Sequence, residues 1–417
     1  MSSSSNNNQA ASDKPLSGNE EAVDAKPSAS SCGNSETDGV QRPMLASQRN
    51  WFAKIQAGDD AAIVAYEYPI YSDVQLRGEI FNGLGPYKIL NALPLQRDGS
   101  VAIAAVLRED LHDDNRWPGA LPPATKTNVE SYHGGSTPEE LAALCSLGLG
   151  IRLRAGDANR AFDSRDPRGR FLGYQQSVPM LIFNRERPVI PGAITRPQLD
   201  SVQKRLRSIP HINPQLFTEL VRSARAYQDA LWIAESEPHL AWLLLVSALE
   251  IAANARVSHS GSPEENLREY QSKLTKALEA AGGQPLVAAV AEQLKNLFSA
   301  TKKFMNFCKE FTPPPPEARP SESLQVDWNW ANLKKVLETI YAHRSHALHA
   351  GIPFPAPMCR PPDEFEGKFS EKGVTSLAES TQGATWLPKD APMSLNTFQY
   401  FVRASLLKWW DHISEQK

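Results

Sequence analysis

Apolar residues recur at steps of three and four over most of the second half of the chain. That spacing places them along one side of a helix with 3.6 residues per turn, so it predicts helices. The predicted helices lie at 213–234, 239–256, 262–311 with a break at Gly282-Gly283, 328–350 and 395–413. Proline-rich and glycine-rich stretches separate the later ones. An all-α helical bundle is therefore predicted for residues 201–417.

Two charged residues interrupt otherwise apolar helix faces. Glu250 lies in the helix at 239–256, which is apolar nearly all round and is expected at the centre of a bundle. Arg344 continues the apolar stripe of the helix at 328–350. A buried charge needs an opposite charge beside it, so the sequence predicts an ion pair between Glu250 and Arg344.

The chain between 46 and 200 has a different pattern. An apolar run at 61–68, an alternating run at 74–80 and the run at 151–154 predict strands, and the runs at 87–95 and 101–107 on either side of Asp98-Gly99 predict a hairpin. Thr137-Pro-Glu-Glu140 predicts a helix start, with Thr137 as N-cap and Glu140 completing a capping box. An α+β domain is therefore predicted for residues 46–200. Residues 1–45 are polar and poor in large apolar side chains, so a disordered N-terminal tail is predicted there.

Composition narrows the class of protein. The 417 residues carry a net charge of −3, so any RNA binding has to be local. The four cysteines form no C-x-x-C pair, which fits a reducing cytosol better than a disulfide framework or a zinc site. The longest nearly apolar run, 240–255, is too short for a membrane span and contains Glu250, and no secretion signal is recognised. A cytoplasmic protein that does not bind a membrane is expected.

Arg344 and His349 are the candidate catalytic residues. Arginine holds a phosphate by two parallel hydrogen bonds and keeps its proton, whereas histidine exchanges protons near neutral pH. Five positions apart on one helix, they are separated by about 7.5 Å along the axis and about 140° around it. A site that uses both therefore lies in a cleft or takes a group from a second subunit. A partnered arginine beside an exposed histidine at the helix end is the alternative interpretation.

Arginines also gather near the end of the predicted α+β domain, where they alternate with three aspartates: Arg152, Arg154, Arg160, Arg165, Arg168 and Arg170. A loop that binds RNA phosphates through Arg152 and Arg154 is one interpretation, and a solvated loop with internal ion pairs is the other. His343, His346 and His349 fan over about 120° of their helix, so a metal site is not expected. No cofactor is expected either, since no Walker loop or G-x-G-x-x-G is present.

The order of parts in residues 213–417 resembles the HEPN superfamily of four- to five-helix domains, and more closely the ApeA-like HEPN group of bacterial proteins. Two motifs carry the resemblance: Leu245-Val-Ser-Ala-Leu-Glu250 and Tyr341-x-x-Arg344-Ser345-x-x-x-His349-x-Gly351. The run from Phe304 to Phe311 before the prolines also fits the group. The resemblance does not extend to the N-terminal half.

The resemblance implies a metal-independent endoribonuclease with an Arg-x4–6-His motif. In such enzymes the RNA 2′-hydroxyl attacks the adjacent phosphate and leaves a 2′,3′-cyclic phosphate end. Carried over to this chain, Arg344 stabilises the phosphorane, His349 is the general acid or base, and Glu250 orients one of them. Ser345 occupies the polar position after the arginine, and His346 is a candidate RNA contact.

The resemblance also implies partners and a setting. In HEPN proteins two motif helices usually meet across a homodimer to form one composite site. Such proteins serve in toxin–antitoxin systems and phage defence, so a protein antitoxin or trigger is a candidate partner, and the domain at 46–200 is a candidate sensor. The alternative is a non-catalytic HEPN module that binds RNA, a nucleotide or a protein partner, with Arg344 and Glu250 as a structural pair.

Overall fold

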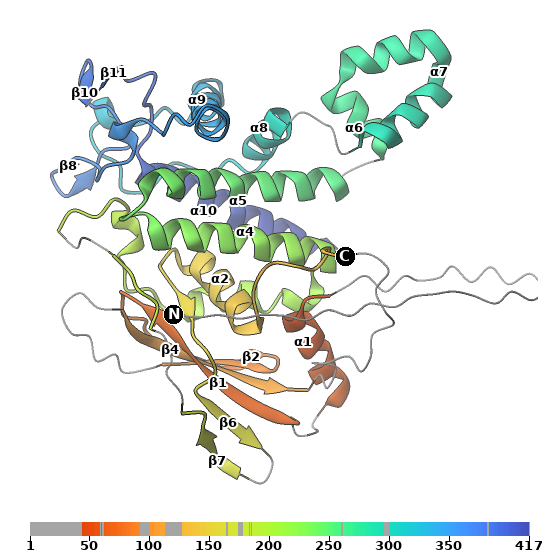
Figure 1. Cartoon of the computed structure of the whole chain (residues 1–417), viewed down its shortest axis with the longest axis vertical. Coiled ribbons are helices and arrows are strands. Elements are labelled where there is room, and N and C mark those ends of the chain that lie inside the picture. The colour runs from red at the N-terminus through yellow and green to blue at the C-terminus, as the bar shows by residue number, and fades with distance from the viewer. Residues whose placement is uncertain are drawn as a thin grey trace, which may run out of the picture. The chain divides into compact units, whose positions relative to one another are not determined.

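A computed structural model describes residues 44–416, apart from 59, 61, 92–100, 113–126, 164–165, 174–177, 183, 185, 260–261, 296–299 and 382. In the described residues a β-sheet with a few helices comes first, and a run of helices follows (Figure 1). The predicted order of an α+β part before a helical part is therefore confirmed. Residues 1–43 of the predicted tail lie outside the described residues. Leu45, assigned to that tail, is buried just before helix α1.

The first part of the chain forms one seven-stranded sheet in which all pairs of strands are antiparallel. Its strand order is β2-β3-β4-β1-β6-β7, and the short β5 also pairs with β1. The strands and the preceding helix have these bounds: α1 Ala46–Ala57, β1 Val64–Ser72, β2 Ile80–Leu84, β3 Tyr87–Asn91, β4 Ala102–Leu111, β5 Arg154–Ala155, β6 Arg160–Asp163 and β7 Asp166–Phe171.

The strand predictions are partly confirmed. The predicted hairpin is β3 paired with β4, while its Asp98-Gly99 turn lies outside the described residues. The alternating residues 74–79 form no strand, and only Arg77 makes an isolated bridge, to Gln198. The arginine-rich segment contains the strands β5, β6 and β7, so the loop conformation that both interpretations assumed is wrong there, while phosphate binding by its arginines stays a prediction. The polar sequence of β6 did not predict a strand. Its backbone is held in the sheet by pairing with β1.

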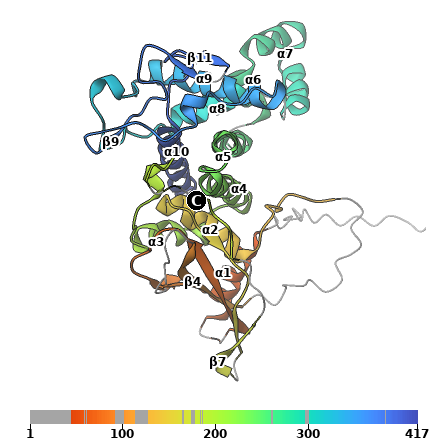
Figure 2. The same cartoon turned by 60° about the vertical axis from the view of Figure 1, so that its left-hand side comes forward.

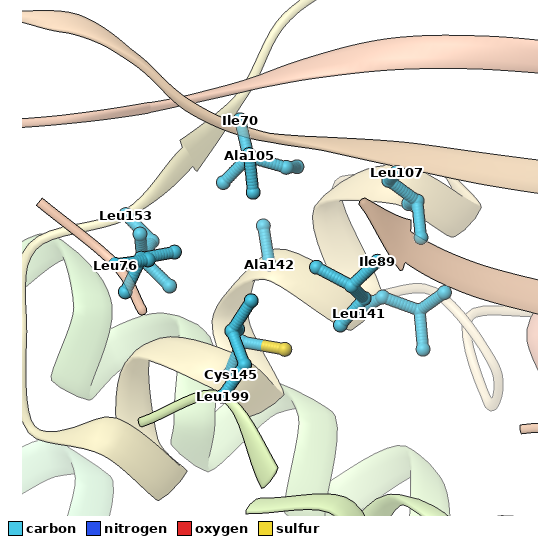
Figure 3. A pocket seen from close by; sticks show the side chains of 10 residues that line it. All are labelled: Ile70, Leu76, Ile89, Ala105, Leu107, Leu141, Ala142, Cys145, Leu153 and Leu199. Carbon is cyan, nitrogen blue, oxygen red and sulfur yellow. The ribbon is translucent and has the colours of Figure 1, made fainter. Parts of the chain in front are cut away.

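Helix α2, Thr137–Leu149, covers the inner face of the sheet. Figure 3 shows Ile70, Ala105 and Leu107 of the strands pointing toward Leu141, Ala142 and Cys145 of the helix. The void between them has a volume of about 10 Å³, which is too small for a ligand. Burial raises the pKa of the Cys145 thiol to about 12, so this side chain acts as an apolar core residue.

The start of α2 corrects the predicted cap by one residue. Ser136, not Thr137, is the N-cap, and Glu139 completes the capping box by accepting from the Ser136 backbone N–H at 2.7 Å. Glu140 is buried instead: it accepts from the Ser47 backbone N–H at 3.2 Å and pairs with His133 Nε2 at 2.9 Å. Glu140 therefore binds Ser47 and His133 instead of the N-cap residue.

The helical part matches the predicted apolar stripes closely. The predicted long helix at 262–311 is divided into three, and Gly283, with a φ of 67°, breaks the middle one. The helices have these bounds: α3 Asp200–Leu206, α4 Pro214–Ile233, α5 Pro238–His259, α6 Pro263–Tyr270, α7 Ser272–Leu294, α8 Ala300–Glu310, α9 Trp330–His349 and α10 Leu395–Glu415.

Short elements occupy the connections between these helices. Two small hairpins and one 3-10 turn lie within the predicted loop at 353–392: η4 Ala356–Met358, β8 Glu364–Phe365, β9 Lys368–Phe369, β10 Glu379–Thr381 and β11 Ala384–Trp386. Three further 3-10 turns in the described residues come earlier: η1 Pro191–Ala193, η2 Ile209–His211 and η3 Glu322–Leu324.

The helices are stacked in layers on the sheet. Helix α4 lies on α2, α5 lies on α4, and α8 and α9 lie on α5, while α10 contacts both α5 and α2 (Figures 1 and 2). By length and composition α5 is apolar enough over Pro238–Arg256 to cross a membrane, a test that the core helix of a bundle also passes. In this structure α5 has α4, α8, α9 and α10 packed against it. The division into domains at residue 200 stays a prediction.

A buried ion pair joins the sheet to the helices. Arg152 is fully buried, and its Nη2 and Nε donate to Asp73 Oδ2 at 2.8 and 3.1 Å. Glu235 of the α4–α5 connection lies 3.8 Å from Arg152 Nη1, and burial raises the pKa of its carboxyl group. Arg152 therefore does not lie in a solvated loop, and its guanidinium has no surface for an RNA contact.

We expect Asp73→Ala to lower the free energy of unfolding by about 3–5 kcal/mol, because it leaves the buried Arg152 cation without its hydrogen-bonding partner. Denaturant unfolding measures this change. The matched control is Asp411→Ala, which breaks the partly exposed pair with Arg205 and is expected to cost less than about 1 kcal/mol. Equal effects of the two substitutions would contradict a special role for the buried pair.

Candidate functional site

The predicted ion pair between Glu250 and Arg344 is confirmed, and it connects α5 with α9. Glu250 Oε2 accepts a hydrogen bond from Arg344 Nη2 at 2.8 Å. The other carboxylate oxygen, Oε1, accepts from the Tyr341 hydroxyl at 2.8 Å. One carboxylate on the central helix thus holds two side chains of the motif helix, which lie one turn apart on the same side.

The guanidinium of Arg344 is held in one orientation, but not all of its N–H donors are used by described residues. Its side chain is 22% exposed, and its Cζ lies 5.7 Å from the centre of the Tyr341 ring. Its Nε is buried and makes no hydrogen bond to any described residue. A guanidinium has five N–H donors, and Glu250 takes one of them in this structure. Arg344 therefore retains donors for an anion while Glu250 sets its orientation.

Sequence reasoning gave no role to Tyr341. Its ring packs on Phe304 of α8 at 4.8 Å between centroids, and its hydroxyl points to Glu250. Burial, and then the neighbouring Glu250 carboxylate, raise the pKa of Tyr341 to about 12. Tyr341 therefore stays a hydrogen-bond donor over the physiological range. The i, i+3 spacing of Tyr341 and Arg344 was a signal that the two share a partner.

Lys303 is a second residue that sequence reasoning missed. It lies on α8, is buried, and donates from Nζ to Asn254 Oδ1 at 3.2 Å. Asn254 follows Glu250 by one turn on α5, so both polar residues lie on the side of α5 that meets α8 and α9. Burial lowers the pKa of the Lys303 amine. In a single sequence Lys303 looks like a surface lysine, and only the position of α8 reveals its burial.

The remaining motif residues lie at the open end of α9. His349 and His346 are exposed and Ser345 is half-buried. The helix ends at His349, and Gly351 just after it takes the left-handed conformation, with a φ of 67°, that glycine adopts readily at helix ends. The structure thus brings Glu250 and Arg344 together and leaves the imidazole of His349 open to solvent.

His343 differs from the other two histidines of the motif helix. Its Nε2 lies 2.7 Å from the Asp390 carbonyl oxygen, which makes that nitrogen the protonated one. Burial lowers the pKa of His343, and the carbonyl contact opposes this effect. His343 is therefore a neutral structural residue that fixes the 387–391 turn to α9. Across the described residues, no three His, Cys, Asp or Glu side chains converge to hold a metal ion.

Arg154 lies far along the chain from this cluster and has partners of its own. Its Nη2 donates to Asp229 Oδ1 of α4 at 2.8 Å, and its Cζ lies 4.8 Å from the Trp232 ring centre. It borders a polar pocket of about 240 Å³ that Arg225 and Glu139 also line. Those two residues form an ion pair at 3.8 Å. The charges of the pocket are thus largely compensated.

Comparison with protein-family models, with curated proteins and with solved structures gives no match for this chain. The candidate site therefore stands on its geometry and on the two sequence motifs.

We expect the absorbance difference between wild type and Tyr341→Phe to titrate near pH 12 rather than near 10, because the phenolate is disfavoured by burial and by Glu250. A spectrophotometric pH titration in the tyrosinate band measures it. When Glu250→Ala is present in both proteins, the difference should titrate at lower pH. A transition near 10 in the first pair would contradict the buried Tyr341–Glu250 contact.

Proposed function

We propose that this chain is a cytoplasmic, metal-independent endoribonuclease of the HEPN type that leaves 2′,3′-cyclic phosphate ends. The observation that carries the proposal is the partly exposed guanidinium of Arg344, which Glu250 orients through Nη2 and whose Nη1 hydrogen-bonds to no described residue. Arginine is the side chain best suited to hold a phosphate bidentately. His349, an exposed group able to exchange protons, lies on the same helix and completes the motif.

The proposed reaction breaks one bond and forms another at a single phosphorus. The 2′-oxygen bonds to the phosphorus as its proton passes to a base, and the bond to the 5′-oxygen breaks as that oxygen receives a proton from an acid. Arg344 stabilises the extra negative charge of the phosphorane. His349 supplies one of the two proton transfers, and the second calls for another group.

A homodimer supplies that second group in this proposal. Leu348 and Ile352, beside His349, are 52% and 53% exposed, so the end of α9 offers apolar surface for a second copy. A partner α9 packed there would bring a second histidine to the same phosphate. Ser345 and His346 would line the shared site, with His346 in contact with the RNA.

The proposed setting is phage defence or a toxin–antitoxin-like stress response. The sheet with α1 and α2 is the candidate sensor, and its close packing on α4 through α2 offers a route by which a trigger or a protein antitoxin would act on the helices.

A non-catalytic HEPN module that binds RNA, a nucleotide or a protein is the second candidate. The salt bridge itself favours it, because Glu250 already takes one donor of Arg344 and offsets its charge. The two candidates differ in what His349 does. A binding module would keep its function without that imidazole, whereas the nuclease would lose cleavage.

We expect induced wild type to arrest a bacterial host and to fragment its RNA, and both His349→Ala and Arg344→Ala to relieve this. The rate of RNA cleavage by purified protein should fall about 10²–10⁴-fold without the proton-transfer group and about 10²–10³-fold without the cation. Gel analysis of total RNA and of a defined oligonucleotide measures both.

The matched control is His211→Ala, which removes an exposed histidine of the 3-10 turn before α4. It should cleave as wild type does. Cleavage that persists in His349→Ala would refute the role of that residue. A folded wild type that cleaves no RNA would favour the binding module.

A further inference from the structure

The outer face of the sheet, opposite α2, carries one row of aligned charged and aromatic side chains. Lys88 pairs with Arg108, Arg108 with Glu67, Glu67 with Arg160, and Arg160 with Phe171, on β3, β4, β1, β6 and β7. Directly paired residues lie on the same face of a sheet. With neighbouring strands about 4.8 Å apart, the row spans about 19 Å.

Aromatic rings stand at both ends of this row. Phe171 closes it on β7 and is 72% exposed, and Phe81 extends it on β2 and is 54% exposed. Phe81 lies 5.6 Å from Lys88 Nζ. A third ring, Phe162, lies in the next row beneath Arg108, whose Cζ is 4.2 Å from its centre. The row therefore has an exposed ring at each end, with Lys88, Arg108, Glu67 and Arg160 between them.

Three arginines of the β6–β7 hairpin have no carboxylate partner among the described residues. Arg160, Arg168 and Arg170 are exposed, and none of them forms a salt bridge with a described residue. Arg108 and Lys88, in contrast, are held by Glu67 and Asp110 at 2.6–3.5 Å. The described part of the hairpin carries these three arginines against the two carboxylates of Asp163 and Asp166, so it is locally positive, although the whole chain is slightly acidic.

The helices that contact the sheet leave this row open. Helix α2 packs on the inner face, Trp51 of α1 meets Tyr87 on that face, and α3 reaches only the edge strand β2. Figures 1 and 2 show the β6–β7 hairpin extending beyond these helices. The described part of the chain therefore presents the row and the hairpin to solvent.

We propose that the outer face of the sheet and the β6–β7 hairpin bind single-stranded RNA. Unpaired bases stack on exposed aromatic rings, and arginines neutralise phosphates, so a surface that carries both suits a single strand better than a duplex. Phe81 and Phe171 take bases and Arg160 takes a phosphate on the outer face. Arg170 pairs with Ala161, so it and Arg168 lie on the opposite face of the hairpin, and they take phosphates where the RNA strand passes around the edge strand β7. The choice of RNA as the nucleic acid rests on the proposed function.

This surface is separate from the Arg344 cluster. The layers of α2, α4 and α5 lie between the outer face of the sheet and α9. The surface therefore recruits or senses RNA and does not form part of the cleaving site. Either activity can consequently be removed without the other.

The experiment measures binding of a fluorescent single-stranded RNA to the full chain by anisotropy, in the Arg344→Ala background to prevent cleavage. Phe81→Ala and Phe171→Ala should each weaken binding roughly 10-fold, as expected for loss of one stacked base. The triple variant Arg160→Ala/Arg168→Ala/Arg170→Ala should reduce the salt dependence by about 2 in the slope of log K against log salt.

Matched controls separate these effects from general losses. Phe365→Ala removes an exposed ring on β8, and Lys204→Ala/Lys273→Ala/Lys276→Ala removes three exposed cations on α3 and α7. Both should bind RNA as the parent does. Circular dichroism confirms that each variant is folded.

Unchanged affinity in the phenylalanine and arginine variants would overturn the inference, even if wild type cleaves RNA. Equal competition by duplex RNA would also overturn it, because stacking needs unpaired bases. Loss of binding in these variants supports it, even if no cleavage is found and the proposed function fails.

Discussion

The carboxylate of Glu250 is the interaction on which the candidate site depends. It is a charged group on an otherwise apolar central helix, and it is acceptable there because Tyr341 and Arg344 each donate to one of its oxygens. The same contacts fix the rotation of α9 against α5, and therefore the direction in which Arg344 faces. Phe304 on α8 packs against Tyr341, so a third helix supports the arrangement.

The chain uses arginine in two different ways. Arg152 is fully buried, held by Asp73, and joins the sheet to the helices, so it contributes to the fold alone. Arg160, Arg168 and Arg170 follow 8 to 18 residues later and stand exposed without an ion pair to any described residue. Position in the fold separates these roles, because Arg152 lies in the core just before β5, whereas the other three lie on β6 and β7 at the edge of the sheet.

The periodic part of the fold could be predicted from sequence, and the polar part only in fragments. The apolar stripes predicted the helices. The position of Glu250 and Arg344 on apolar helix faces predicted that the two residues form an ion pair. The β6–β7 hairpin was missed because its strands are rich in arginine and depend on pairing with β1. Lys303 and Tyr341 were missed as members of the site because their surroundings come from α8, whose position no local pattern encodes.

The chemistry of the cleaved ends tests the central claim most directly. Purified wild type would be incubated with a single-stranded RNA in excess EDTA, and the new 3′ ends would be identified by mass spectrometry. The account predicts cleavage without divalent metal and 2′,3′-cyclic phosphate ends, because the 2′-oxygen is the nucleophile. Ends that carry a 3′-hydroxyl, or cleavage that EDTA abolishes, would contradict it.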